Sequence, residues 1–371
     1  MLYPLALASL LFSAGPQPAR ALAPEILDVR PAQDLNALFE RNEGWTGGDG
    51  VASVPLAPGR ILWLFADTWV GKVKDGKRVN ATIVNNTAVV QDGIGEKPAM
   101  RFFVRRDASG KAIALLTPQR GAGWFWPQAA AFDGKRLYVF LTQVERTGAG
   151  GAFGFRLTGQ SLGIVSNPLE APTQWHVEQR KLPFTEIGAK RELTFGAALL
   201  TEGEHLYIYG VDDIAQGQWR HKNMVLARAP LASVADFRTW CFYREGNWIT
   251  DAAKAGQLVS GVGNDYSVTY HARLKSYVLV STEYGLSQNI IARIAPAPWG
   301  PWSSPAIVYN CPEAGWNKNI FCYGGRAHPE LVRDDDELVI SYVANSFDFW
   351  QVARDARLYW PRFIRARIRP K

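Results

Sequence analysis

The sequence has few of the residues that build metal sites and membrane domains. Its 371 residues include only three cysteines, with neither a Cys-x-x-Cys pair nor a Cys/His spacing suited to zinc. Beyond the N-terminus no apolar run reaches the roughly 18 residues of a membrane span, which excludes a polytopic membrane protein. The hydrophobic share of 47% excludes intrinsic disorder, because it supplies enough apolar surface for a core. We therefore expect a folded protein without a bound metal or cofactor.

Residues 1–23 have the pattern of an export signal. An apolar stretch from Leu2 to Phe12 is too short to span a bilayer, and an Ala-Leu-Ala cleavage pattern ends at Ala23. Two features weaken the pattern, because no Lys or Arg precedes the apolar stretch and Pro24 would follow the cut. The alternative is a buried N-terminal strand or helix. We expect export to a secreted or periplasmic location, with no membrane association afterwards.

Cysteine pairing depends on that location. Export would place the thiols in an oxidising compartment, where disulfides persist. Cys311 and Cys322 could then close a short loop through a disulfide, leaving Cys241 buried and free. The spacing alone does not decide between this disulfide and three free thiols.

The net charge of +7 is concentrated near the C-terminus. Residues 354–371 carry seven Lys and Arg against one Asp, so the rest of the chain is nearly balanced. A basic chain can indicate nucleic-acid binding. Between Arg362 and Arg369, however, arginines alternate with apolar residues, as in a half-exposed strand. We expect a packed outer strand and no nucleic-acid partner.

Aromatic and turn-forming residues point to an all-β protein. The chain has 14 Trp, 13 Tyr, 18 Phe, 34 Gly and 22 Pro. One pattern recurs five times: a short apolar strand, a polar turn, and a strongly hydrophobic strand. Equivalent positions of the second strand lie 62 to 75 residues apart, at Trp63, Tyr138, Tyr207, Val278 and Val339. Five such hairpins predict a five-bladed β-propeller, with two stacked sheets as the alternative.

The domain organisation follows from this repeat. The propeller domain is expected over residues 45–371, and residues 24–44 lead into it. The last repeat has clear strands only at residues 327–332, 338–343 and 363–368, one fewer than four. The short run 26–29 is free to supply the missing strand, so we expect the two chain ends to pair and close the ring.

Two acidic residues in the first repeat are candidate catalytic groups. Asp49 precedes the first strand and Asp67 follows the second, and Pro58 at the hairpin tip lies midway between them. Directly opposed residues in such a hairpin lie about 5 Å apart at Cα. Like charges this close raise the pKa of one carboxyl group, and a neutral acid beside an ionised carboxylate is what glycoside hydrolysis requires. The alternative is an ordinary Gly-rich loop and a strand-end cap.

The other repeats place polar and aromatic residues at equivalent positions. Asp265 opens the fourth repeat and is the third candidate catalytic residue. The candidate substrate-binding residues are Trp45, Asn85, Asn86, Trp126, Tyr266, His328 and Glu330. Aromatic rings of this kind can stack on sugar faces. The alternatives are a turn at Asp265, a core histidine at His328, and Trp side chains that pack between blades.

Several segments of the chain resemble a known family, the domain of unknown function 4185. They are Gly44–Gly50, Ile61–Trp69, Val84–Thr87, Trp299–Trp302, Ala327–Leu331 and Ile340–Asp348. Members of that family are five-bladed propellers, and some are bacterial endo-D-arabinanases. The resemblance implies an acidic pair on blade one, carried here by Asp49 and Asp67. Asp265 is assigned from its blade position alone.

Together these features predict an exported glycoside hydrolase that acts on a furanose-containing, arabinan-like glycan. The expected partner is a poly- or oligosaccharide, and the protein is expected to be a monomer. The alternative is a propeller that binds carbohydrate without cleaving it, and a third reading is a protein-interaction scaffold. The paired carboxylates discriminate between these, since a binding module does not need them.

Overall fold

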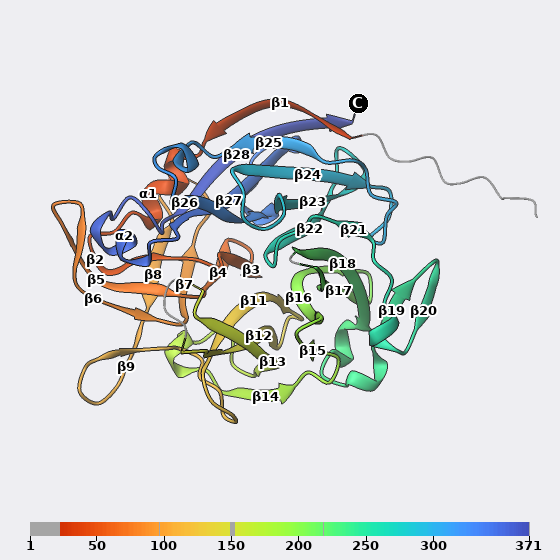
Figure 1. Cartoon of the computed structure of the whole chain (residues 1–371), viewed down its shortest axis with the longest axis horizontal. Coiled ribbons are helices and arrows are strands. Elements are labelled where there is room, and N and C mark those ends of the chain that lie inside the picture. The colour runs from red at the N-terminus through yellow and green to blue at the C-terminus, as the bar shows by residue number, and fades with distance from the viewer. Residues whose placement is uncertain (1–22, 96, 149–152, 218, 371) are drawn as a thin grey trace, which may run out of the picture.

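Five antiparallel sheets stand around a central axis in the computed structural model, which describes residues 23–370 except 96, 149–152 and 218 (Figure 1). Blade one contains β3 (Ala52–Ala57), β4 (Arg60–Phe65), β7 (Thr87–Asp92) and β8 (Ala99–Phe103). Blade two contains β11 (Trp124–Phe132), β12 (Leu137–Arg146), β13 (Phe155–Val165) and β14 (Val177–Lys181). In these two blades the first strand is innermost, and the inner strands β3 and β11 contact each other.

The remaining blades follow the same plan. Blade three contains β15 (Glu186–Ile187), β16 (Arg191–Glu202), β17 (His205–Gln216), β18 (Trp219–Pro230), β19 (Cys241–Arg244), β20 (Asn247–Ile249) and β21 (Val259–Ser260). Its innermost long strand is β16. Blade four contains β22 (Tyr266–His271), β23 (Ser276–Thr282), β24 (Asn289–Ala295) and β25 (Ala306–Asn310). Blade five contains β26 (Ile320–Ala327), β27 (Glu337–Ser346), β28 (Pro361–Pro370) and β1 (Pro24–Pro31).

Smaller elements decorate the ring. A three-stranded sheet projects from blade one and contains β2 (Glu43–Gly48), β5 (Thr68–Lys74) and β6 (Lys77–Val84). The other short elements are β9 (Arg105–Arg106), β10 (Ala112–Ile113), α1 (Gln33–Phe39), α2 (Phe349–Arg354) and the 3-10 helices Pro172–Gln174, Leu231–Ser233, Phe237–Thr239, Ala252–Lys254, Pro312–Gly315 and Pro329–Leu331. None of the helices in the described part of the chain is both long and apolar enough to cross a membrane.

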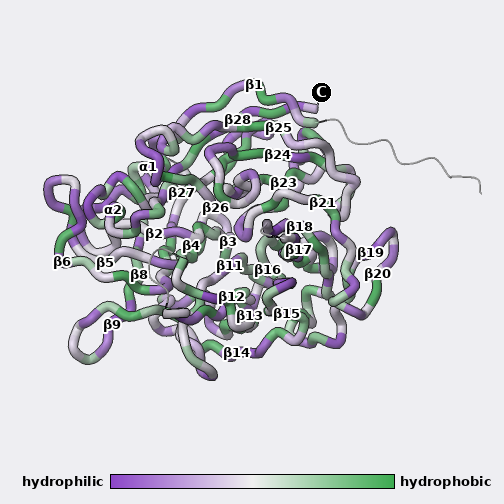
Figure 2. The backbone as a smooth tube through the Cα atoms, viewed as in Figure 1, coloured by the Kyte–Doolittle hydropathy of each residue, from purple (hydrophilic) through white to green (hydrophobic). Residues whose placement is uncertain are grey.

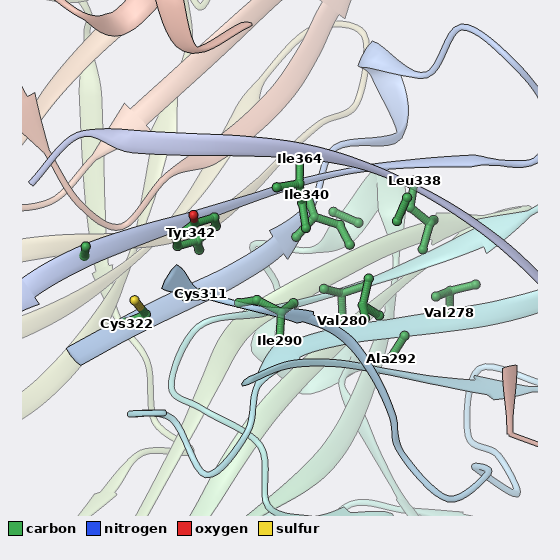
Figure 3. Packing of buried hydrophobic residues seen from close by; sticks show 14 of the residues in the cluster. Val278, Val280, Ile290, Ala292, Cys311, Cys322, Leu338, Ile340, Tyr342 and Ile364 are labelled. Atoms are coloured by element: carbon green, nitrogen blue, oxygen red, sulfur yellow. The ribbon is translucent and has the colours of Figure 1, made fainter. Parts of the chain in front are cut away.

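Hydrophobic clusters fill the spaces between neighbouring blades. Figure 3 shows one of them, where Val278 and Val280 of blade four face Leu338 and Ile340 of blade five. Figure 2 shows that hydrophobic and hydrophilic segments are separated in the same way. Blade strands such as β24 are largely hydrophobic, while the outer turn between β5 and β6 is hydrophilic. A central strand buried on both faces needs a nearly continuous apolar run. Burial on both faces therefore explains why the second strand of each repeat is strongly hydrophobic.

The predicted five-bladed propeller is confirmed. The five residues used to align the repeats fall on the second strand of each blade, on β4, β12, β17, β23 and β27. A further cluster joins blade five to blade one, with Val339 and Phe363 packed in the same core as Trp63 and Phe65. Blade five therefore packs against blade four on one side and against blade one on the other.

The predicted inner strand of blade five is wrong. Pro329–Leu331 forms a 3-10 helix, and the inner strand is β26, earlier in the chain. The Gly324-Gly325 pair interrupts the apolar pattern of β26 and coincides with a bulge between Tyr323 and Arg326. Pro329 lacks the N–H that a central strand must donate. The correction moves residues 328–330 from the start of the inner strand to its far end.

The chain ends lie side by side at the outer edge of blade five (Figure 1). β1 runs antiparallel to β28, with Ile26 opposite Ile368 and Val29 opposite Ala366, which is the place predicted for residues 26–29. The Arg-rich strand β28 is packed as predicted, but it lies between β27 and β1 rather than outermost. Its arginines pair with carboxylates, as Arg365 does with Glu337 at 2.7 Å.

The predicted export signal lies almost entirely outside the described residues. Cys241, Cys311 and Cys322 carry free thiols. Cys311 and Cys322 are buried and close enough for their thiols to hydrogen-bond, and that contact raises the pKa of Cys311. Cys241 is partly exposed rather than buried, because it begins the short outer strand β19.

Candidate active site

A cavity of about 640 Å³ opens at the face where the inner strands begin and the second strands end. All five blades contribute to its wall, because the same ends of all five hairpins meet there. The polar and charged lining residues include Asp49, Asp67, Asn85, Arg146, Glu192, Asp213, Arg220, Lys222, Asp265, Tyr323, Asn345 and Tyr359. The size lies within the range of pockets that take small-molecule ligands.

Asp49 and Asp67 lie together at the junction of blade one with its projecting sheet. Asp49 follows β2 and Asp67 follows β4, so each carboxylate stands where the hairpin leaves the blade. The Asp49 amide donates to the Asp67 carbonyl at 3.2 Å, and the Ala66 amide donates to the Asp49 carbonyl at 2.8 Å. Two residues thus oppose one, which is the pattern of a β-bulge and can re-aim a side chain. The hairpin symmetry seen in the sequence brings the two acids together.

Asp49 has the environment of a neutral acid. Its Oδ2 accepts hydrogen bonds from the hydroxyl groups of Tyr323 at 2.5 Å and Tyr359 at 2.8 Å. Its Oδ1 is buried and has no hydrogen-bond partner among the described residues. Burial, and next the charge of Asp67, raise the pKa of Asp49 to about 8, against the effect of the two hydroxyl donors. Asp49 is therefore mostly protonated at neutral pH.

Asp67 has the environment of a carboxylate. Its Oδ1 accepts hydrogen bonds from Trp126 Nε1 at 2.9 Å and Asn85 Nδ2 at 3.0 Å. Burial raises the pKa of Asp67 to about 6, and the two N–H donors and the charge of Arg146 limit the rise. Asp67 is thus mostly ionised at neutral pH. The two carboxyl groups differ because Asp67 has amide and indole donors while Asp49 bears the repulsion of its neighbour.

Asp265 lies on the same cavity wall, just before β22. Its Oδ1 accepts a hydrogen bond from Arg326 Nη2 at 2.8 Å, and the Arg326 side chain is only 5% exposed. The charge of Asp265 contributes to the raised pKa of Asp49. The structure therefore brings the three predicted acids to one cavity, together with Asn85 and Trp126.

Three other predicted binding residues are buried in the protein and do not line this cavity. Trp45 donates from Nε1 to Thr87 Oγ1 at 3.2 Å, which ties the projecting sheet to blade one. Asn86 donates to the carbonyl of Phe125 at 2.9 Å, which ties blade one to blade two. The Tyr266 hydroxyl donates to the Gly210 carbonyl at 2.7 Å, which ties blade four to blade three. Their polar atoms are used in packing, so they offer no contact to a ligand in the cavity.

His328 and Glu330 also lie away from the cavity, as the corrected blade-five strand requires. His328 lies within hydrogen-bond distance of Ser53 Oγ at 2.6 Å and Ser341 Oγ at 2.7 Å. Burial lowers the pKa of His328 to about 3, and burial raises the pKa of Glu330. The neutral imidazole therefore bridges blades one and five at the far end of the hairpin.

Several cavity residues were missed from the sequence. Tyr323 lies on the unrecognised strand β26, and Tyr359 lies in the connection before β28, where no strand pattern marks it. Glu192 and Asp213 are paired residues of β16 and β17. The symmetry argument used for Asp49 and Asp67 would have missed this pair, because the register of β16 and β17 shifts between Phe195 and Ala198.

The blade-three pair forms a charged wall. Arg220 Nε lies 3.0 Å from Asp213, and Lys222 Nζ lies 4.0 Å from it. Burial raises the pKa of Glu192. Alternating acids and bases can donate to and accept from sugar hydroxyl groups.

Aromatic rings form the wall next to the acidic pair. Trp124 and Trp126 of blade two lie 6.1 Å apart, and Phe155 lies 4.7 Å from Trp126. Phe153 extends the row to Phe321 of blade five, with ring centroids 6.2 Å apart. These side chains all line the cavity. Within the described residues, no group of three or more His, Cys, Asp or Glu side chains is arranged to hold a metal ion.

Fold and cavity together define a five-bladed β-propeller with a carboxylate pair on blade one. The chain belongs to the family described as domain of unknown function 5005, whose model matches residues 32–367. The resemblance to the domain of unknown function 4185 stays a prediction. No curated protein matches the sequence.

Solved structures include several that are similar to this chain. One is a hydrolase candidate from Bacteroides ovatus ATCC 8483, with 21% identity, 91% of this chain and 90% of that chain covered, and a TM-score of 0.72. Another is a thermostable family-43 glycoside hydrolase, with 12% identity, coverage of 88% and 91%, and a TM-score of 0.48. A third is the GH43_1 enzyme from Xanthomonas citri complexed with xylose, with 15% identity, coverage of 91% and 93%, and a TM-score of 0.47. At 21% identity, the likeness to the Bacteroides ovatus structure concerns the fold alone.

Proposed function

We propose that this protein is a glycoside hydrolase in which Asp49 is the general acid and Asp67 is its ionised partner. The observation that carries the proposal is the pair itself, two carboxyl groups on one cavity wall with pKa values raised to about 8 and about 6. Glycoside hydrolysis needs one carboxyl group neutral and the other charged at the same pH. The environments described above supply this difference near neutral pH.

The roles follow from the unused atoms of each group. Asp49 Oδ2 is held by two tyrosine hydroxyl groups, so the proton of the acid is placed on Oδ1, which has no other partner among the described residues. Asp67 keeps Oδ2 for the reaction, because its Oδ1 accepts from Trp126 and Asn85. The charged Asp67 either attacks the anomeric carbon or activates a water molecule. Asp265, paired with Arg326, adds negative charge that keeps Asp49 protonated.

The substrate proposed is a furanose-containing, arabinan-like glycan outside the cytoplasm. The arabinan class rests on the family resemblance, and export rests on the pattern of residues 1–23. The cavity supports a carbohydrate ligand more generally. Aromatic faces on blades two and five can stack on sugar rings, and the charged side chains of blade three can bind hydroxyl groups.

The direct test is a panel of arabinans and related polysaccharides incubated with the protein and assayed for new reducing ends. Activity on one glycan should fall by about 10²–10⁴-fold in Asp49→Asn and in Asp67→Asn, because an amide cannot transfer the proton or attack. Glu192→Gln, which changes a carboxyl group across the cavity, is the matched control and should retain more activity than either. If both Asn variants kept wild-type turnover, the assignment would be wrong. Binding without cleavage would instead favour a carbohydrate-binding propeller.

A further inference from the structure

Arg78 of β6 is a buried arginine beside the candidate active site, and its side chain binds backbone carbonyl groups. The guanidinium donates to the Thr46 carbonyl from Nε at 3.1 Å and from Nη2 at 2.8 Å. It also donates to the carbonyls of Val352 at 2.6 Å and Leu358 at 2.7 Å. The residue is 7% exposed. Burial lowers its pKa to about 10, so it remains charged at neutral pH.

The three carbonyl groups belong to segments whose backbone hydrogen bonds are not all supplied by a regular helix or strand ladder. Thr46 lies at the irregularity where the pairing of β2 with β5 shifts. Val352 lies in the short helix α2, whose last carbonyl groups have no intrahelical donor. Leu358 lies in the connection between α2 and β28. One planar cation with a fork of donors therefore joins blade one's projecting sheet to the connection before β28.

Two of these segments carry the acid and one of its donors. Thr46 lies three residues before Asp49, and Leu358 immediately precedes Tyr359, whose hydroxyl donates to Asp49 Oδ2 at 2.8 Å. The Tyr359 backbone has φ of 69°, a conformation that is uncommon for a bulky residue and needs support from its surroundings. A Cβ on Gly47, whose φ is 137°, would lie 2.5 Å from the Tyr359 carbonyl oxygen. The two segments are in contact at this point.

We propose that Arg78 is a positioning residue for the proposed acid, because its guanidinium holds Tyr359 in place to donate to Asp49. Its role in catalysis rests on the proposed function. The positioning itself does not, since it is a statement about the hydrogen bond between Tyr359 and Asp49. Arg78 contacts neither carboxyl group of the pair in the described hydrogen bonds and acts through the backbone.

The test measures the titration of Asp49 directly. In protein labelled with ¹³C at aspartate side-chain carboxyl groups, the Asp49 resonance is the one that Asp49→Asn removes. Tyr359→Phe should raise the pKa of Asp49 by about one unit, because a hydrogen bond to the charged form is lost. Arg78→Lys keeps the charge but cannot reach three carbonyl groups in the same fork, so it should raise the pKa in the same direction. This readout needs no substrate, so it stands even if no glycan is cleaved.

The double variant and a control separate positioning from general destabilisation. Arg78→Lys combined with Tyr359→Phe should move the Asp49 titration no further than Tyr359→Phe alone, because both changes remove the same bond. Arg365→Lys alters another buried arginine, bonded to Glu337, and should lower the melting temperature without moving the titration. A folded Arg78→Lys protein with an unchanged Asp49 titration, or additive shifts in the double variant, would overturn the proposal.

A second variant covers the case in which Arg78→Lys does not fold. In Gly47→Ala the new Cβ would lie 2.5 Å from the Tyr359 carbonyl oxygen and 2.7 Å from Arg78 Nη2, so it disturbs the same contact from the other side and should also raise the pKa of Asp49. If Gly47→Ala folds and the Asp49 titration is unchanged, the contact does not position Tyr359 and the proposal is wrong. For an active glycan, Arg78→Lys should lower kcat more than it raises KM.

Discussion

Replacing Asp49 with Asn should remove a pH-dependent loss of stability from this protein. The pKa of Asp49 is about 8 in the folded protein against 3.8 for an ordinary aspartate, so the folded state keeps a proton that the unfolded state has lost. A group with a raised folded-state pKa contributes its stability fully below the unfolded pKa, and this contribution is lost as pH rises through the folded pKa. The free energy of unfolding should therefore fall between about pH 4 and pH 8.

The size of this effect follows from the two pKa values. At about 1.4 kcal/mol per unit, a change from 3.8 to about 8 corresponds to roughly 6 kcal/mol across the window. This is of the same order as the whole stability of a typical domain. Asparagine has nearly the same shape and no charge at any pH, and it relieves the repulsion of Asp67. Asp49→Asn should thus equal the wild type near pH 4 and exceed it by several kcal/mol at pH 8.

The assay is denaturant unfolding at pH 5, 6, 7 and 8. Asp236→Asn is the control, because Asp236 is partly exposed at the surface and Arg238 lowers its pKa to about 2, below this window. That variant should show the same decline from pH 5 to pH 8 as the wild type. If Asp49→Asn declined just as steeply, Asp49 would not hold a proton in the folded state, and its assignment as the acid would fail with it.

Three further outcomes are expected. Trp126→Phe removes an N–H donor to Asp67, so the pKa of Asp67 should rise and the acidic limb of the pH–rate profile should move to higher pH; an unmoved limb would contradict this. Deleting residues 24–30 exposes the edge of β28 and should lower the melting temperature, and an unchanged value would show that the pairing adds no stability. His328, with a pKa lowered to about 3, contributes stability above about pH 6.5 that is lost as pH falls toward 3. His328→Gln should flatten this acid-side decline in unfolding measurements, and a slope like that of the wild type would argue against a neutral buried imidazole.

The sequence alone determined the ring and the position of the acidic pair. A strand buried on both faces must be nearly all apolar, so each second strand is visible as a local run, and five such runs gave the blade count. Hairpin pairing is also local, because residues equidistant from the tip face each other. Asp49 and Asp67 could therefore be paired from their numbers.

Blade five shows where local pattern was insufficient. The strand β26 carries two adjacent glycines and a bulge, which break the alternation that marks a strand, while the chain around Pro329 imitates one. His328 and Glu330 were consequently expected at the cavity but lie at the far end of the blade. Asn86 was expected to face a ligand. In the structure its side-chain amide instead donates to a backbone carbonyl group of the neighbouring blade.

Only the tertiary structure decided the chemistry of the pair. Asp67 differs from Asp49 because Trp126 comes from another blade to donate to it, and Tyr323 and Tyr359 come from blade five to bind Asp49. These partners are separated from the acids by 59 to 310 positions in the chain. A pKa depends on burial and on the groups within a few ångströms. Local sequence fixes which acids are neighbours, but the closure of the ring sets which one keeps its proton.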